Sequence, residues 1–165
     1  MLEIILLKMK KDMYIVELIN SQYIDGKFNR VDLVVRYMYV KEYMEKNNDF
    51  EATDIYLCMV EKRGCFGYKS ETEWLLDFNV TINSIKNNGF DEEFPILVNK
   101  SNLLWDGSHR LAISFCLGIE DVSIKKMNPP KIGRWGFDWF EKNNFSSSHL
   151  DQINSCFEKY FKVIV

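Results

Sequence analysis

The segment from Ser70 to Gly89 constrains the fold more than any other part of the chain. Ser70 and Glu73 have the spacing of a capping box, in which hydroxyl and carboxylate each satisfy an amide at the start of a helix. Gly89 stands where a left-handed residue would end that helix. The apolar residues between them recur on one face: Trp74, Leu75, Phe78, Ile82 and Ile85. We predict an amphipathic helix from Glu71 to about Asn87, whose apolar face other elements must cover.

Short strands and further helices are predicted on both sides of this helix. Asp25-Gly26 is typical of a hairpin turn. The predicted strands are Leu2–Leu7, Tyr14–Ile19, 94–98, 103–105 and 122–126. The predicted helices are 31–46, 54–63 and 111–117, then a short one entered from a loop at 133–140, and a last one capped by Ser148. Strands and helices interleaved in this way indicate an α+β fold.

Length and composition indicate one globular domain. A chain of 165 residues with 47% hydrophobic positions can bury a sizeable core. The sequence contains no apolar run near the ~18 residues of a membrane span, and its first residues lack the pattern of a secretion signal. Its four cysteines lack metal-type spacing, which favours reduced thiols. We therefore expect a single cytoplasmic domain, residues 1–165, with no membrane association.

The balance of charge argues against nucleic acid as the main partner. The chain has 21 Lys and Arg against 24 Asp and Glu, a net charge of −3. Proteins that bind nucleic acid usually carry a basic excess, because neutralising phosphates supplies much of their affinity. A local basic patch remains compatible with this balance, and the oligomeric state stays open.

The run Asp106-Gly107-Ser108-His109-Arg110 contains the strongest candidate functional residues of the sequence. A predicted strand ends here and a helix begins at once, so the first helical amides have no internal acceptor. Such a turn favours anions, and Ser108, His109 and Arg110 add donors suited to phosphate. Asp106 can hold Mg²⁺ or take a proton. Taken alone, the five residues are more typical of an ordinary turn with a helix cap.

The surrounding sequence resembles the ParB/sulfiredoxin superfamily. The resemblance covers a core segment of about 71–126, with residues 1–70 and a helical extension at 128–165 on either side. It rests on these runs: Thr81–Gly89, Phe94–Val98, Leu103–Ala112, Leu117–Ile119 and Val122–Ile124. It implies a small mixed sheet with surrounding helices. It also implies that Gly107, Ser108, His109 and Arg110 bind nucleotide phosphates.

The motif is closest to the branch that resembles free-serine kinases. Sulfiredoxins carry a catalytic cysteine where this chain has Ser108, so sulfinic-acid reduction is not expected. Partition ParB proteins have an acidic residue and arginine in place of His109-Arg110, and a DNA-binding domain follows. The Asp-Gly-x-His-Arg form instead implies a kinase that uses ATP or ADP with Mg²⁺.

Residues outside the core segment complete the predicted site. Asp32 and Arg36 lie four residues apart on an otherwise apolar helix, with Arg30 at its start. We consider Asp32 a candidate catalytic base and Arg36 a substrate ligand, although an ordinary helix ion pair explains the spacing as well. Arg134 and Trp135 are candidate substrate-binding residues, because an aromatic ring can stack on a base or sugar.

These observations lead to one expected function and two alternatives. We expect a nucleotide-dependent phosphotransferase that acts on a small hydroxyl-bearing metabolite such as an amino acid or a sugar-like molecule. Asp106 and His109 would serve the metal or the proton transfer. The alternatives are a ParB-like nuclease or DNA-associated nucleotide-binding module, and a nucleotide-binding protein without catalytic activity.

Overall fold

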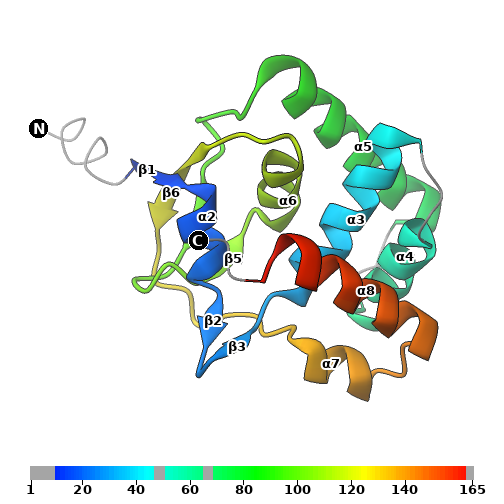
Figure 1. Cartoon of the computed structure of the whole chain (residues 1–165). Coiled ribbons are helices and arrows are strands. Elements are labelled where there is room, and N and C mark those ends of the chain that lie inside the picture. The colour runs from blue at the N-terminus through cyan, green and yellow to red at the C-terminus, as the bar shows by residue number, and fades with distance from the viewer. Residues whose placement is uncertain (1–9, 47–50, 65–68, 163–165) are drawn as a thin grey trace, which may run out of the picture.

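A small mixed sheet forms one side of the molecule in the computed structural model, which describes residues 10–46, 51–64 and 69–162 (Figure 1). Its strands are β1 (Lys10–Tyr14), β4 (Ile96–Val98), β5 (Leu104–Asp106) and β6 (Asp121–Lys126), in the order β1-β6-β4-β5. β6 is antiparallel to β1 and parallel to β4, while β5 is antiparallel to β4. Between the parallel strands β4 and β6 the chain forms β5 and then α6 (Ser108–Cys116). This helix starts directly after the end of β5.

Helix α3 (Val31–Glu45) is the centre of the helical side of the molecule. It packs against α6, α4 (Ala52–Lys62) and α8 (Ser147–Tyr160) (Figure 1). Every residue from 31 to 40 is buried, including two charged ones. A helix covered on all sides belongs to the core rather than the surface. The two charged residues of this stretch, Asp32 and Arg36, are therefore held inside the protein.

The long helix predicted after the capping box is confirmed as α5 (Glu71–Asn88). Ser70 accepts from the Glu73 amide and the Glu73 carboxylate accepts from the Ser70 amide. Gly89 ends the helix with φ of 78° and ψ of −176°, so its backbone is not the left-handed cap that we predicted. Phe78, Ile82 and Ile85 are its buried residues, and it packs against α6.

The N-terminal part corrects one prediction and confirms another. Tyr14–Ile19 is not a strand, because β1 ends at Tyr14 and Ile15–Asn20 forms the helix α2. The apolar residues Ile15, Leu18 and Ile19 have helical spacing and are all buried, which outweighs their preference for strands. The predicted hairpin is present, with β2 (Tyr23–Ile24) paired to β3 (Lys27–Phe28). The predicted strand Leu2–Leu7 lies outside the described residues.

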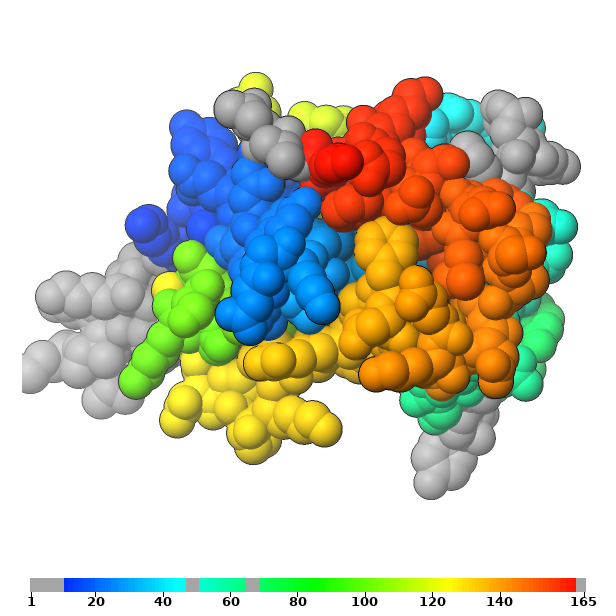
Figure 2. All heavy atoms as spheres, turned by 60° about the horizontal axis from the view of Figure 1, so that its bottom comes forward, coloured from blue at the N-terminus to red at the C-terminus, as the bar shows by residue number. Residues whose placement is uncertain are grey.

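The C-terminal segment lies across the face formed by the hairpin and α8. Figure 2 shows residues 127–140, which include the start of α7 (Phe137–Lys142), next to the hairpin. The cap of the last helix, α8, is Ser146, two residues before the predicted Ser148. The Ser146 hydroxyl accepts a hydrogen bond from the His149 amide. Ser148, the predicted cap, is instead inside the first turn.

One hydrophobic core joins all parts of the described chain. It includes Val34 from α3, Ile82 from α5, Ile124 from β6 and Phe161 beyond α8. The α+β class and the single domain are thus observed, with a small mixed sheet and helices around it. None of the helices within the described residues has both the length and the apolar character needed to cross a membrane.

Candidate functional site

The turn between β5 and α6 has the geometry predicted for an anion site. Gly107 has φ of 101°, in the left-handed region. This backbone conformation favours glycine, and a Cβ here would also lie 2.7 Å from the end of the Ile96 side chain. The first helical bond is donated by the Leu111 amide to Gly107 O at 2.9 Å. Among the described residues, the amides of 108–110 have no acceptor, and they stand at the positive end of α6.

His109 is held in a neutral state beside these amides. Its Nε2 lies 2.9 Å from the hydroxyl of Tyr56, which is fully buried on α4. Phe78 packs against the imidazole edge with the ring centroids 4.6 Å apart. Burial, together with the positive charges of Arg36 and Arg63, lowers the pKa of His109 well below its usual value. At pH 7 the ring is therefore uncharged.

A hollow of about 200 Å³ opens beside His109. It is lined by Tyr56, Trp74, Asp77, Phe78, Thr81, His109 and Arg110. Aromatic walls with few polar groups are typical of small-molecule sites. The Trp74 indole N–H is buried without a hydrogen-bond partner among the described residues.

Arg110 and Asp106 form the outer edge of the turn. Arg110 Nη1 donates to the carbonyl oxygens of Phe94 and Pro95, which ties α6 to the segment before β4. Its Nη2 lies 3.6 Å from Asp106 Oδ2. The Asp106 side chain is 68% exposed, and the described residues contain no group of three or more acidic, histidine or cysteine side chains that could hold a metal by themselves. Asp106 is thus a single, open carboxylate.

Asp32 is enclosed by arginines rather than open to a substrate. Its carboxylate accepts from Arg30 Nε and Nη2, each at 2.7 Å, and from Arg36 Nη1 at 2.8 Å. Arg63 Nη1 lies 3.9 Å away. Burial alone would raise the pKa of Asp32, but the three cations hold it far below its usual value. This geometry favours a positioning role for Asp32 over the predicted role of a base.

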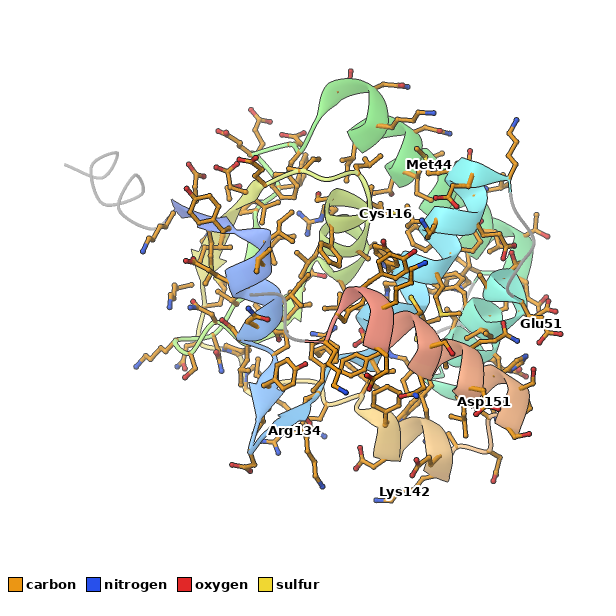
Figure 3. The ribbon with its side chains drawn as sticks, in the orientation of Figure 1. Met44, Glu51, Cys116, Arg134, Lys142 and Asp151 are labelled. Carbon is orange, nitrogen blue, oxygen red and sulfur yellow. The ribbon has the colours of Figure 1, made fainter. Side chains whose placement is uncertain are left out.

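Trp135 packs against two of the arginines around Asp32, whereas Arg134 lies apart from them. The guanidinium of Arg63 lies 3.8 Å from the Trp135 ring centroid, and that of Arg30 lies 5.2 Å from it. Backbone bonds between Trp135 and residues 29 and 31 hold this loop in place. Arg134 is exposed beside the hairpin (Figure 3) and, together with Trp135 and Trp139, lines a hollow of about 690 Å³ that is distinct from the one beside His109.

The sequence alone did not reveal Tyr56 on α4 and Arg63 directly after it as residues of the site. Tyr56 and Arg63 precede His109 by 53 and 46 positions, and no local pattern links them to it. Packing of α4 and α6 on α3 brings them together. Comparison of the chain with protein-family models, with curated proteins and with solved structures finds no match. The superfamily membership therefore stays a prediction from the motif.

Proposed function

We propose that this protein binds ATP or ADP at the start of α6 and transfers a phosphoryl group to a small hydroxyl-bearing metabolite. The observation that carries the proposal is that the amides of Ser108, His109 and Arg110, which have no acceptor among the described residues, adjoin an uncharged histidine that lines a hollow. Phosphoryl transfer needs little more than a cradle for the phosphates, positive charge and a proton acceptor. These requirements are met by residues 107–110.

The amides of Ser108, His109 and Arg110 would bind phosphate oxygens of the nucleotide. They point from the positive end of a helix of nine residues, where anions are stabilised. The Ser108 hydroxyl adds a donor. Arg110 has donors left besides the Nη1 that holds the β4 segment, and these would offset charge on the phosphates.

Asp106 suits a magnesium ion that arrives with the nucleotide. Mg²⁺ is commonly held by one or two carboxylates together with substrate phosphates and water. One exposed carboxylate directly before the phosphate-binding turn fits that donor set. When bound, the ion would neutralise charge that develops on the phosphates.

His109 would accept the proton of the acceptor hydroxyl. Tyr56 engages Nε2, so Nδ1 is the nitrogen available to a substrate, in the tautomer that donates Nε2–H to the tyrosine oxygen. The acceptor oxygen forms its bond to the terminal phosphorus as the bond to the bridging oxygen breaks. The proton passes to Nδ1, and the shortened nucleotide leaves with the electron pair.

The role of His109 is tested by His109→Gln, with His149→Gln as the matched control. Glutamine can still bond to Tyr56 but cannot take up the proton, so turnover should fall by roughly 100-fold or more. His149 lies on α8 beside Glu51, outside the hollow, and its substitution should leave turnover unchanged. The measurement is phosphorylated product formed from Mg·ATP or Mg·ADP and a panel of amino acids and sugars, followed by phosphorus NMR. Full activity of His109→Gln would remove this residue from the mechanism.

Thermal unfolding with separate ligands distinguishes the alternatives. A nucleotide with Mg²⁺ should stabilise the protein by about 2.7 kcal/mol at a hundredfold excess over its dissociation constant. A short DNA duplex should give no shift. Stabilisation by the duplex that falls steeply with salt would favour the DNA-associated module instead. Stabilisation by nucleotides without any product would indicate a binding protein.

A further inference from the structure

The segment between β6 and α7 borders a hollow that the proposed reaction does not use. Its volume is about 690 Å³, against about 200 Å³ for the hollow beside His109, and the two share no lining residue. Sites for small molecules usually measure about 300–1,000 Å³, so this one has room for a whole ligand. We call it the tryptophan hollow. The lining residues that matter most are Asn99, Leu103, Lys131, Arg134, Trp135 and Trp139.

Two indole rings line the tryptophan hollow, and both are held in place by the fold. The guanidinium of Arg63 lies 3.8 Å from the Trp135 ring centroid. A Cβ at Gly133 would lie 1.9 Å from the same ring, so this glycine lets the loop pass close to the indole. Trp139 packs against Phe140 with the ring centroids 5.0 Å apart. A ligand therefore meets rings that are already in position, which lowers the entropy cost of binding.

The charged side chains that line this hollow are both positive. They are Lys131 and Arg134, and none of the described lining residues is acidic. Both side chains are exposed, and neither has an ion pair or hydrogen bond with any part of the chain that the structure describes. The protein as a whole has a net charge of −3, so this local pair of cations stands against the overall balance. Such a hollow attracts anions.

The polar side chains of the tryptophan hollow are mainly hydrogen-bond donors. Lysine, arginine and the indole N–H can only donate. The carboxamide oxygen of Asn99 already accepts from the amides of Ser101 and Leu103, each at 2.9 Å. A ligand matched to this hollow therefore accepts hydrogen bonds and donates few. A carboxylate or a phosphate meets this requirement, whereas the many hydroxyl groups of a neutral sugar do not.

We propose that the tryptophan hollow is a binding site for an aromatic anion, a flat ring that carries a carboxylate or a phosphate group. The ring would pack against Trp135 and Trp139, since aromatic rings prefer stacked or edge-to-face contacts with one another. Arg134 and Lys131 would bind the anionic group. This site is separate from the start of α6, and the inference does not depend on phosphoryl transfer.

The competing explanation is that the hollow is a solvated gap and that its two cations only serve solubility. In that case anions bind weakly, and the ring of a ligand makes no difference. Four probes separate the two explanations. Naphthoate and naphthyl phosphate carry both ring and charge, naphthalenemethanol carries the ring alone, and octanoate carries charge on a flexible chain.

The tryptophans of the chain report where a probe binds. Trp135 and Trp139 line this hollow, Trp74 lines the one beside His109, and Trp105 lines neither. The experiment titrates the full chain with each probe and follows the four indole N–H signals in nitrogen-15 NMR spectra. We expect naphthoate, naphthyl phosphate or both to shift the signals of Trp135 and Trp139 until they saturate, with that of Trp74 unchanged. The signals are assigned with Trp74→Phe, Trp105→Phe, Trp135→Phe and Trp139→Phe.

Substitution of the two cations tests the anionic part of the proposal. Arg134→Gln, Lys131→Gln or both should weaken binding about tenfold, as loss of a charge-assisted hydrogen bond does. The matched control is Lys142→Gln, which removes an exposed charge on α7 outside the hollow and should leave binding unchanged. These side chains are exposed, so the variants should fold like the parent protein. The better of the two aromatic anions identifies the preferred anionic group.

Several results would overturn the inference. They are the absence of saturable shifts with either aromatic anion, equal affinity for naphthalenemethanol or octanoate, and equal affinity of the parent protein and both charge variants. His109→Gln locates the site independently, because it should leave binding of the aromatic anions intact. Loss of binding in His109→Gln, or shifts confined to Trp74, would place the ligand in the other hollow and refute the assignment.

Discussion

The character of His109 is set by residues that lie far from it in the sequence. Its hydrogen-bond partner is Tyr56 on α4, and its pKa is lowered first by burial and then by the positive charges of Arg36 on α3 and Arg63 directly after α4. A histidine in this environment is uncharged at neutral pH, and burial among cations disfavours its protonation.

The lowered pKa of His109 predicts that acid destabilises the protein. Below the unfolded value of about 6.5 the unfolded chain binds a proton that the native imidazole refuses, so the free energy of unfolding falls as pH falls toward the folded pKa. The loss from this one residue should be about 1 kcal/mol between pH 6.5 and pH 5.5.

Urea unfolding of the parent protein and of His109→Gln at several pH values measures this loss. The difference in unfolding free energy between the two should decrease in acid, because glutamine does not titrate. His149→Gln controls for the other histidine of the chain. Parallel pH curves for the parent and His109→Gln would show that the imidazole is not held neutral in the native state.

At the scale of elements, a strand, a glycine turn and a helix form the candidate phosphate site. β5 ends at Asp106, Gly107 takes the left-handed backbone, and α6 starts at Ser108. Local sequence predicts this order of strand, turn and helix, because an apolar run precedes Gly107 and glycine readily takes the left-handed backbone that the turn needs. The helix was expected from 111 and starts three residues earlier, which places Ser108, His109 and Arg110 in its first turn.

The start of α8 gives an element-scale prediction with an internal control. The Ser146 hydroxyl accepts from the His149 amide at 3.1 Å, while Ser148 faces Gln152 within the helix. Ser146→Ala should therefore lower the free energy of unfolding by about 1 kcal/mol, and Ser148→Ala by a few tenths at most. Chemical denaturation of both variants checks this. A larger effect at Ser148 would show that the helix starts where the sequence suggested.

At the scale of the whole molecule, the central position of α3 makes the fold depend on residues before, within and after the segment of about 71–126. Residues 31–40 are buried against α4, α6 and α8, and they include both Asp32 and Arg36. The segment that resembles a superfamily core, about 71–126, thus lacks the helix on which its own α6 packs.

We predict that a fragment of residues 69–127 does not fold on its own. It would expose the apolar faces of α5 and α6 and would be small for a stable core. Circular dichroism during heating should show a cooperative transition for the full chain and none for the fragment. A cooperative transition of the fragment would mean that this segment is an independent domain.

Local sequence determined much of the architecture. The capping box of α5, the hairpin at Asp25-Gly26 and the turn at Gly107 were predictable, since each depends on the hydrogen bonds or backbone freedom of neighbouring residues. Tyr14–Ile19 was mispredicted because a short apolar run suits a strand and a buried helix equally well.

Tertiary structure alone decided the electrostatics of the site. Asp32 and Arg36 read in the sequence as one ion pair, but folding adds Arg30 and Arg63 around the same carboxylate and places Trp135 against Arg63. It also brings Tyr56 to His109. Charge and burial depend on distance through space, which packing of α3, α4 and α6 sets and which the order of residues along the chain does not contain.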